Sequence, residues 1–401
     1  MRSLLFTGAI ALCSLIASAQ ENKSKLDRIS VKGQFQWRTE SAVNRRAVQG
    51  SRQSELSLSR FRAFIKLNSN EKLSFNLTPQ AAKGFGAKDG NDITSGTTNH
   101  TEINFLESNL QYKLSKALEV KLGRQQIGYG DFLVIGKRPW NNTSASFDAI
   151  KFRYQLTNGW VDGAFSKISD EGTARVSNDD TDFAWIYSSF NLGQMFQEVD
   201  VYLMHQDNDS SSPVEVNTLG FRIKGSHGDA FFRTENGIQQ GSNLGDEAFQ
   251  YNFEVGRRFK KYSISAEWAH AGKNYREMYP NPHKFLGLAD VLARRNLKQV
   301  AIHLRGKPAD WLAFGVDYHK FERSSTDAPA YTFLNASTWG TNGSSSDVGS
   351  EVDFFANFIS KDNIRLLLGY SLFMPGTYMK QNQNNLDETT RFTYAQIRAT
   401  F

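Results

Sequence analysis

Basic side chains recur on the polar face of several short alternating stretches of this 401-residue chain. Lysine and arginine around a channel raise the local concentration of anions, and guanidinium groups match the two oxygens of a carboxylate. A uronate polymer would present one such carboxylate on each sugar. The basic residues expected to face a lumen are Arg62, Lys66, Lys151, Arg153, Arg222, Lys224, Arg305 and Arg365.

Acidic residues lie on the same faces and leave a second interpretation open. The cations would then only solvate a water-filled interior, paired with Glu107, Asp148, Glu351 and Asp353. The chain has 47 basic and 41 acidic residues, a formal net charge of +6. Because this excess is small, we favour a locally basic constriction over a uniformly basic pore.

The segment 126–146 combines charge with aromatic character, and we expect it to fold inward as the constriction. The residues that could form a charged network there are Arg124, Asp131, Lys137, Arg138, Trp140 and Asp148. Strand parity puts Arg124 on the side of Leu122, away from the polar face, unless Gly123 begins a bulge. For Lys137 and Arg138, ordinary loop charge without a role in the pore is an equal alternative.

Motifs for catalysis or metal binding are absent from the sequence. The seven histidines are scattered, with no H-E-x-x-H, C-x-x-C or G-x-S-x-G pattern, and Gly130 to Arg138 misses the spacing of a phosphate loop. Two acidic clusters, Asp179-Asp180-x-Asp182 and Asp207-Asn208-Asp209, could bind calcium, but solvated loop tips are the favoured interpretation. We therefore predict no catalytic residues, no cofactor and no metal site.

The elements that must position these residues are β-strands, because apolar and polar residues alternate with a period of two. In 148–154, for example, Ile150, Phe152 and Tyr154 oppose Lys151 and Arg153. We expect eighteen strands, near 29–38, 55–68, 71–79, 104–114, 117–125, 147–156, 159–167, 182–192, 196–206, 214–225, 228–236, 248–259, 261–270, 297–306, 310–321, 349–360, 363–373 and 390–401.

The connections between these strands alternate between short turns and long loops. Tight links near 68–71 and 115–117 contrast with long segments at 80–103, 126–146 and 271–296. An even antiparallel sheet with this alternation is the plan of an outer-membrane β-barrel. The prolines fit it, with Pro79 expected to close a strand and the others to lie in loops and turns.

A soluble β-sandwich or propeller is the alternative fold. Strands of about ten residues are long for soluble sheets, and one-sided apolar faces are unusual in a sandwich. The final strand ends in Phe401, which resembles the assembly signal of bacterial outer-membrane proteins. We therefore predict an all-β, transmembrane antiparallel barrel of about 18 strands, with short periplasmic turns and long extracellular loops.

The first nineteen residues have the features of a signal peptide. Arg2 is followed by an apolar run and by Ala17-Ser18-Ala19, an A-x-A cleavage site. The only cysteine, Cys13, lies in this segment, so the mature chain would have neither disulfides nor a thiolate. We expect residues 1–19 to be removed and residues 20–401 to form a single barrel domain with net charge +5.

Several motifs resemble the alginate export family of outer-membrane β-barrels. One block runs from Leu122-Gly123-Arg124-Gln125-Gln126 through Tyr129-Gly130-Asp131 and Trp140-Asn141-Asn142 to Phe147-Asp148-Ala149. Gly349-Ser350-Glu351-Val352-Asp353 resembles the family's Gly-x-Glu-x-Asp block, although Ser350 stands where members often have His. Gly369-Tyr370-Ser371-x-Phe373-x-Pro375-Gly376 resembles the following hairpin, and Arg60-Phe61-Arg62 resembles the paired basic residues of the second strand.

The resemblance implies a monomeric eighteen-stranded barrel with a basic, constricted pore. We expect a passive channel for an anionic polysaccharide or oligosaccharide, with alginate as the cargo that the family implies. The alternatives are a general small-anion porin and, from another class, an outer-membrane enzyme or adhesin. The expected partners are outer-membrane lipid, lipopolysaccharide and the barrel-assembly machinery, which would recognise the strand ending in Phe401; no nucleic acid partner is expected.

Overall fold

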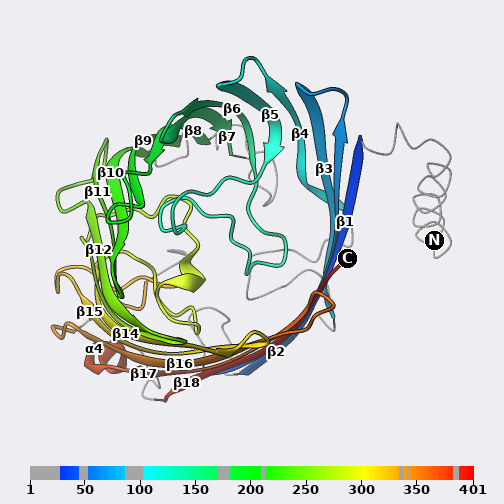
Figure 1. The fold of residues 1–401 in the computed structure, drawn as a ribbon. Helices are drawn as coiled ribbons and strands as arrows, with labels where there is room; N and C mark the ends of the chain where they lie inside the picture. The colour runs from blue at the N-terminus through cyan, green and yellow to red at the C-terminus, as the bar shows by residue number, and fades with distance from the viewer. Residues whose placement is uncertain are drawn as a thin grey trace.

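A computed structural model describes residues 28–44, 53–85, 103–168, 181–208, 214–333, 338–340, 343–382 and 388–401. In this part of the chain, eighteen strands form one closed antiparallel barrel (Figure 1). Each strand pairs with its neighbours in sequence, and β1 pairs with β18 to close the ring. The signal-peptide prediction falls outside the described residues.

The strands follow one another around the barrel without a crossover. They are β1 Ile29–Val43, β2 Gln53–Asn68, β3 Leu73–Phe85, β4 Asn104–Lys113, β5 Leu118–Gln125, β6 Phe147–Leu156, β7 Gly159–Lys167, β8 Thr181–Phe190, β9 Glu198–Asn208, β10 Val214–His227, β11 Ala230–Gln240, β12 Phe249–Phe259, β13 Tyr262–Ala271, β14 Leu297–Ala309, β15 Leu312–Arg323, β16 Asp347–Ile359, β17 Ile364–Pro375 and β18 Thr390–Thr400. The prediction of eighteen alternating strands is confirmed.

Helix is limited to two short elements among the described residues. A 3-10 helix, η2, spans Pro282–Lys284, and α4 spans Thr377–Asn382. No helix in the described ranges is long and apolar enough to cross a membrane.

The outer face carries the apolar residues expected for contact with lipid. Trp37, Phe61, Leu122, Phe152 and Trp268 are all between 43% and 55% exposed. On the same strands, the alternate residues are polar or buried and point to the lumen. The strand period thus separates a lipid face from a lumenal face.

Proline placement differs from the expectation at three positions, one of which is Pro375, the last residue of β17. Pro79 lies inside β3, where the register with β4 shifts between Thr78 and Pro79. Pro308 lies in β14, and the register with β15 shifts between Gly306 and Ala309. The prediction that Pro79 closes a strand is wrong, because such an irregularity removes the need for a proline N–H without ending the strand.

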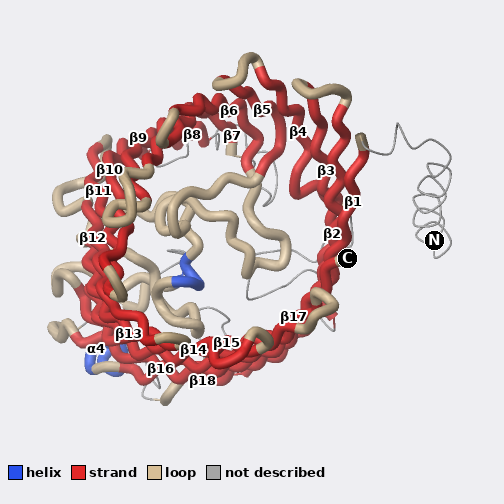
Figure 2. The backbone as a smooth tube through the Cα atoms, in the orientation of Figure 1, coloured by secondary structure: helices blue, strands red, loops and turns tan. Residues whose placement is uncertain are grey.

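The lumen is partly filled by two long loops, which lie inside the ring of strands (Figure 2). Residues 126–146 connect β5 to β6, and residues 272–296 connect β13 to β14. Both return to the wall and bury apolar side chains against it. The loops, and not a uniform aqueous interior, therefore define the shape of the pore.

Candidate functional site

The two lumenal loops form one unit through backbone pairing. The N–H of Gly136 donates to the carbonyl of Tyr279 at 2.7 Å, and the N–H of Tyr279 donates to Val134 at 3.0 Å. The N–H of Asn281 donates to the carbonyl of Phe132 at 2.9 Å. Because buried backbone groups need partners, this pairing lets both segments enter the lumen.

Aromatic side chains on the lumenal wall anchor the first loop. Tyr129 stacks on Tyr187 of β8 with ring centroids 4.2 Å apart, and its hydroxyl accepts a hydrogen bond from Nε1 of Trp185 at 2.9 Å. Trp160 of β7 also faces this cluster, 5.8 Å from Tyr129. Trp160 and Trp185 therefore lie on the lumenal face and not in an outer aromatic girdle.

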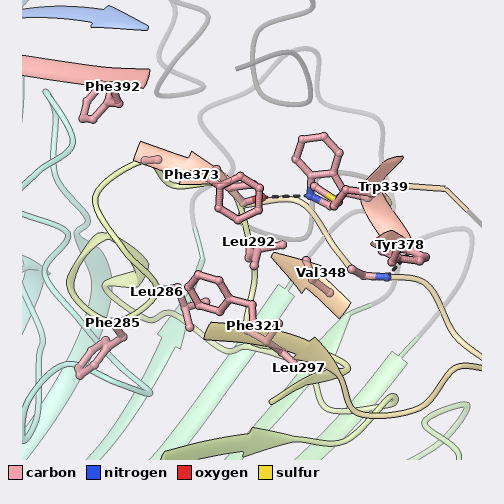
Figure 3. Close-up of a cluster of buried hydrophobic side chains, with 14 of the residues drawn as sticks. Phe285, Leu286, Leu292, Leu297, Phe321, Trp339, Val348, Phe373, Tyr378 and Phe392 are labelled. Carbon is pink, nitrogen blue, oxygen red and sulfur yellow. Dashed lines mark hydrogen bonds between the residues drawn. The ribbon is translucent and has the colours of Figure 1, made fainter. Parts of the chain in front are cut away.

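The second loop has its own apolar anchor on the barrel wall (Figure 3). Phe285, Leu286 and Leu292 are buried with Phe321 of β15 and Phe373 of β17. Lumenal faces of these strands carry aromatic residues where a water-filled pore would carry polar ones. These aromatic side chains pack against the loop, so the inward face of the sheet is only partly polar.

Arginine side chains of β1 and β2 hold the backbone carbonyls of the first loop. Arg38 donates from Nη1 to the carbonyl of Trp140 at 2.6 Å, and its guanidinium lies 3.8 Å from the indole centroid. Arg60 donates to the carbonyl of Asn141 at 3.0 Å, and Arg62 donates to Oγ of Ser144 at 2.8 Å. We call Arg38, Arg60 and Arg62 the arginine latch.

The arginine latch places two of the predicted pore residues beneath the loop. Arg60 and Arg62 are only 2% and 5% exposed. Within the described residues neither makes an ion pair with a carboxylate. Both side chains therefore position the loop. Their positive charge also contributes to the electrostatic potential in the lumen.

Carboxylates of β16 hold backbone N–H groups of the second loop in the complementary way. Oε1 of Glu351 accepts from the N–H of Ala289 at 2.8 Å, and Oδ2 of Asp353 accepts from Leu288 at 3.2 Å. Gly287 has φ +88°, and a Cβ there would collide with the Glu351 carboxylate. We call Glu351 and Asp353 the carboxylate latch, and both are almost fully buried.

Asp131 is the charged centre that joins the first loop to the second loop and to the wall. Its Oδ2 accepts from Nη2 of Arg222 at 2.8 Å and lies 3.6 Å from Nη1 of Arg233, while Nζ of Lys284 donates to its backbone carbonyl at 3.0 Å. Burial by itself would raise the pKa of Asp131, but Arg222, Arg233 and Lys284 together hold it below the usual range. The carboxyl is thus ionised at neutral pH.

Arg138 and Lys137 have different surroundings despite being adjacent. Arg138 has φ +46° and donates from Nε to the carbonyl of Pro280 at 3.0 Å. Burial lowers the pKa of Arg138, and Glu277 opposes this shift. Lys137 is exposed, and among the described residues it makes no ion pair.

Several of the other predicted cations are neutralised by acidic neighbours. Lys151 lies 2.9 Å from Oδ2 of Asp162, and Arg153 lies 2.6 Å from Oδ1 of the same carboxylate. Lys224 lies 3.2 Å from Glu198, and a bidentate contact joins Arg305 to Asp317. The sequence prediction included neither Asp162 nor Asp317, because a carboxylate partner on the next strand is visible only once the register is known.

Arg124 and Asp148 are not in the lumen. They lie directly opposite each other on β5 and β6, 3.0 Å apart, on the face that exposes Leu122. Gly123 has φ +111°, but the register of β5 with both neighbours is unbroken. Their prediction as pore residues is therefore wrong. Asp148 cannot neutralise a lumenal cation, whereas Glu107 lies 3.7 Å from Lys121 inside the barrel.

One wall of the lumen carries a large excess of basic residues. We call the inward cations of β17, β18, β1 and β2 the basic wall: Lys32, Arg38, Arg60, Arg62, Lys66, Arg365 and Arg398. Glu40, which pairs with Arg38 at 2.5 Å, is the inward carboxylate on the described part of these strands. Arg365 and Arg398 lie directly opposite each other across β17 and β18.

The acidic loop clusters are only partly described. Asp179, Asp180 and Asp209 lie outside the described residues. Asp182 lies on the outer face of β8, 3.4 Å from Lys167, and this pair gives no indication of a calcium site.

A closed barrel of eighteen antiparallel strands with loops folded into its lumen defines an outer-membrane channel. A sequence model of the alginate export family matches residues 27–392. The chain belongs to the alginate export family of outer-membrane β-barrels, as its motifs predicted. No curated relative matches the chain in sequence.

Solved structures of outer-membrane porins share the fold at low sequence identity. OccAB3 of Acinetobacter baumannii is 12% identical, with a TM-score of 0.65 and coverage of 93% of this chain and 99% of that one. OccK8 (OprE) of Pseudomonas aeruginosa is 9% identical, with a TM-score of 0.64 and coverage of 94% and 98%. These similarities concern the fold alone.

Proposed function

We propose that this outer-membrane protein is a passive channel for an anionic polysaccharide or oligosaccharide, with a uronate polymer such as alginate as the cargo that its family suggests. The observation that carries the proposal is the basic wall. Seven inward cations face one inward carboxylate on four adjacent strands of the described barrel. A polyanion that follows this wall meets Lys32, Lys66, Arg365 and Arg398 directly, and the three buried arginines of the latch act on it only through the potential in the lumen.

Electrostatics gives the basic wall a measurable effect on ion passage. A unit charge about 8 Å from a permeating ion changes its energy by about 0.5 kcal/mol at the dielectric constant of water, roughly twofold in local concentration. Cations that line a narrowed lumen therefore favour anions over cations. The loops narrow the lumen beside this wall, and Lys137 adds an exposed cation on the first loop.

The proposal includes no catalytic step. Cargo would cross down its own gradient, filtered by the width of the pore and by the basic wall. Lipopolysaccharide and membrane lipid around the barrel, assembly by the outer-membrane machinery through the last strand, and a monomeric state remain predictions.

Single-channel recording in planar bilayers tests the proposal. We expect a preference for chloride over potassium, and current block by added uronate oligomers from the side they enter. Replacing Arg365 and Arg398 with Ala should lower the anion-to-cation permeability ratio about two- to fourfold. Arg257→Ala is the matched control, because Arg257 is a cation at the same short-turn end but on the outer face. A cation-selective channel that ignores uronates would contradict the proposal.

A general small-anion porin is the second candidate. It is favoured by the acidic partners of Lys151, Arg153, Lys224 and Arg305. These ion pairs leave little net positive charge on the inward faces of β6, β10 and β14. Anion selectivity without block by uronate oligomers would identify this alternative. Measured hydrolysis of a lipid or glycan would instead favour an enzyme.

A further inference from the structure

Two histidines and an aspartate meet on the inward face of β14 and β15. His303 lies directly opposite Asp317 across these strands, and His319 is the next inward residue after Asp317. Opposite His319 is Ala301, whose small side chain leaves room beside the imidazole. None of these residues belongs to the arginine latch or to the carboxylate latch.

The distances within this group suit binding to a single ion. Nδ1 of His303 lies 2.7 Å from Oδ1 of Asp317, and the two imidazole centroids are 5.7 Å apart at an angle of 70°. One nitrogen from each histidine and a carboxylate oxygen all lie within 4.8 Å of one another. Zinc holds such donors at roughly 2.0–2.2 Å, so modest side-chain rotation would bring all three around one ion.

Buried donor atoms without partners provide an independent indication of a ligand. Nε2 of His303 is shielded from solvent and has no hydrogen-bond partner. Oδ1 of Asp353 is likewise buried and without a hydrogen-bond partner. Oε2 of Glu267 lies 3.5 Å from Nε2 of His303, and Oδ2 of Asp353 lies 3.5 Å from Nε2 of His319. Unpartnered buried polar atoms are costly, and a bound cation would satisfy them.

Arginines and carboxylates surround this group together. Arg305 binds both oxygens of Asp317, Oδ1 through Nη1 and Oδ2 through Nη2, and Oδ1 also contacts Nδ1 of His303. Arg233 pairs with Glu267 at 2.9 Å. Asp353 and Glu351 add further carboxylates next to His319. A bound cation would therefore share the Asp317 and Glu267 carboxylates with Arg305 and Arg233.

The group can be reached from the lumen. A cavity of about 400 Å³ is lined by His303, Glu267 and Arg305 on the wall and by Asp131 and Lys284 on the loops. An ion that enters the pore can therefore approach His303 without unfolding the wall.

We propose that His303, Asp317 and His319 form a site for a first-row divalent metal ion of the Zn²⁺ type, with Glu267 close enough to complete the coordination. Two imidazoles and a carboxylate suit this class of ion better than Ca²⁺ or Mg²⁺, which prefer oxygen ligands. The bound ion adds two positive charges beside the 400 Å³ cavity. It therefore strengthens the anion preference of the channel, and protons compete with it for the histidines.

The test uses the full folded barrel in detergent, stripped of metal with EDTA and titrated with Zn²⁺ against a chromophoric chelator. We expect one ion per chain at pH 7.5 and clearly weaker binding at pH 5.5. His303→Gln and His319→Gln should each weaken binding at least about tenfold. His205→Gln is the matched control, since His205 lies on the outer face beside Glu215. Co²⁺ absorption bands of a histidine-ligated ion should appear in the wild type and disappear in both variants.

A second readout separates binding in the lumen from binding elsewhere. Zn²⁺ at micromolar concentration should shift the reversal potential toward greater anion selectivity in the wild type and in His205→Gln, but not in His319→Gln. Heat-modifiable gel migration confirms that each variant is folded. Equal Zn²⁺ affinity in the wild type and in folded His303→Gln and His319→Gln would overturn the site, and so would Ca²⁺ binding as tight as Zn²⁺ binding.

Discussion

At the residue scale, the register of neighbouring strands decides which lumenal cations remain uncompensated. Lys151 and Arg153 share Asp162, whose side chain is fully buried, whereas Arg365 faces Arg398. The sequence predicts that these basic residues point inward, because side-chain parity depends only on the strand period. It does not predict their partners, because a contact across strands depends on register.

The buried Asp162 should therefore be important for stability. Asp162→Asn leaves Lys151 and Arg153 without their anion and weakens the acceptor of the Tyr129 hydroxyl, 2.9 Å away. Removing one partner of a buried ion pair costs about 3 kcal/mol or more. Urea unfolding in lipid vesicles measures the loss. Asp182→Asn, in the half-exposed pair with Lys167, should cost less than about 1 kcal/mol; equal losses would contradict the role of burial.

Asp131 makes docking of the loops sensitive to acid. Arg222, Arg233 and Lys284 depress the folded pKa of its carboxyl below the unfolded value of about 3.9, despite the opposing effect of burial. The group therefore stabilises docking above about pH 4 and loses this contribution as pH falls further. Single-channel conductance should rise when the bath is taken from pH 7 to pH 3.

Asp131→Asn supplies the control for this pH dependence. Its conductance should already be raised at pH 7, because the neutral amide attracts Arg222 and Lys284 less strongly. Acidification should then change it less than it changes the wild type. Identical pH profiles for the two proteins would show that other carboxylates govern the acid response.

At the scale of elements, two latches of opposite polarity fix the lumenal loops. The arginine latch binds carbonyl oxygens of residues 140–143, and the carboxylate latch binds N–H groups of residues 288–289. The sequence predicts the inward fold of 126–146 from its charged and aromatic content. It misses the second loop, whose apolar residues at 285–292 read as ordinary loop until the wall aromatics that bury them are known.

Releasing the arginine latch should open the pore. Arg60→Ala with Arg62→Ala removes the donors that hold the carbonyls of Asn141 and Thr143, so the mean conductance and its noise should increase. Lys66→Ala removes a basic residue from the same strand and face without a loop contact in the described structure. If Lys66→Ala raises the conductance equally, the effect comes from charge and not from the latch.

At the scale of the whole molecule, local patterns predict the barrel and its strand count well. Alternation and the placement of short turns require no knowledge of distant contacts, so all eighteen strands were predictable from the sequence. The closure of the ring is different in kind. It pairs β1 with β18, at opposite ends of the chain, and the loop-closure entropy of this contact is the largest in the fold.

Phe401 should therefore control the completion of the barrel. Its N–H donates to the carbonyl of Gly33 at 3.0 Å, its own carbonyl accepts from the Gly33 N–H at 2.6 Å, and its ring covers Gly33 and lies 6.5 Å from Phe61. Phe401→Ala keeps the backbone pair but uncovers Gly33, so refolding into lipid should slow severalfold, as expected for a contact of long sequence separation. Heat-modifiable gel migration over time measures the folded fraction. Phe259→Ala removes an equally outward aromatic at the same end of the barrel, away from the closure, and should leave the rate nearly unchanged. If both variants fold at the same rate, closure of β1 on β18 is not the slow step that the topology implies.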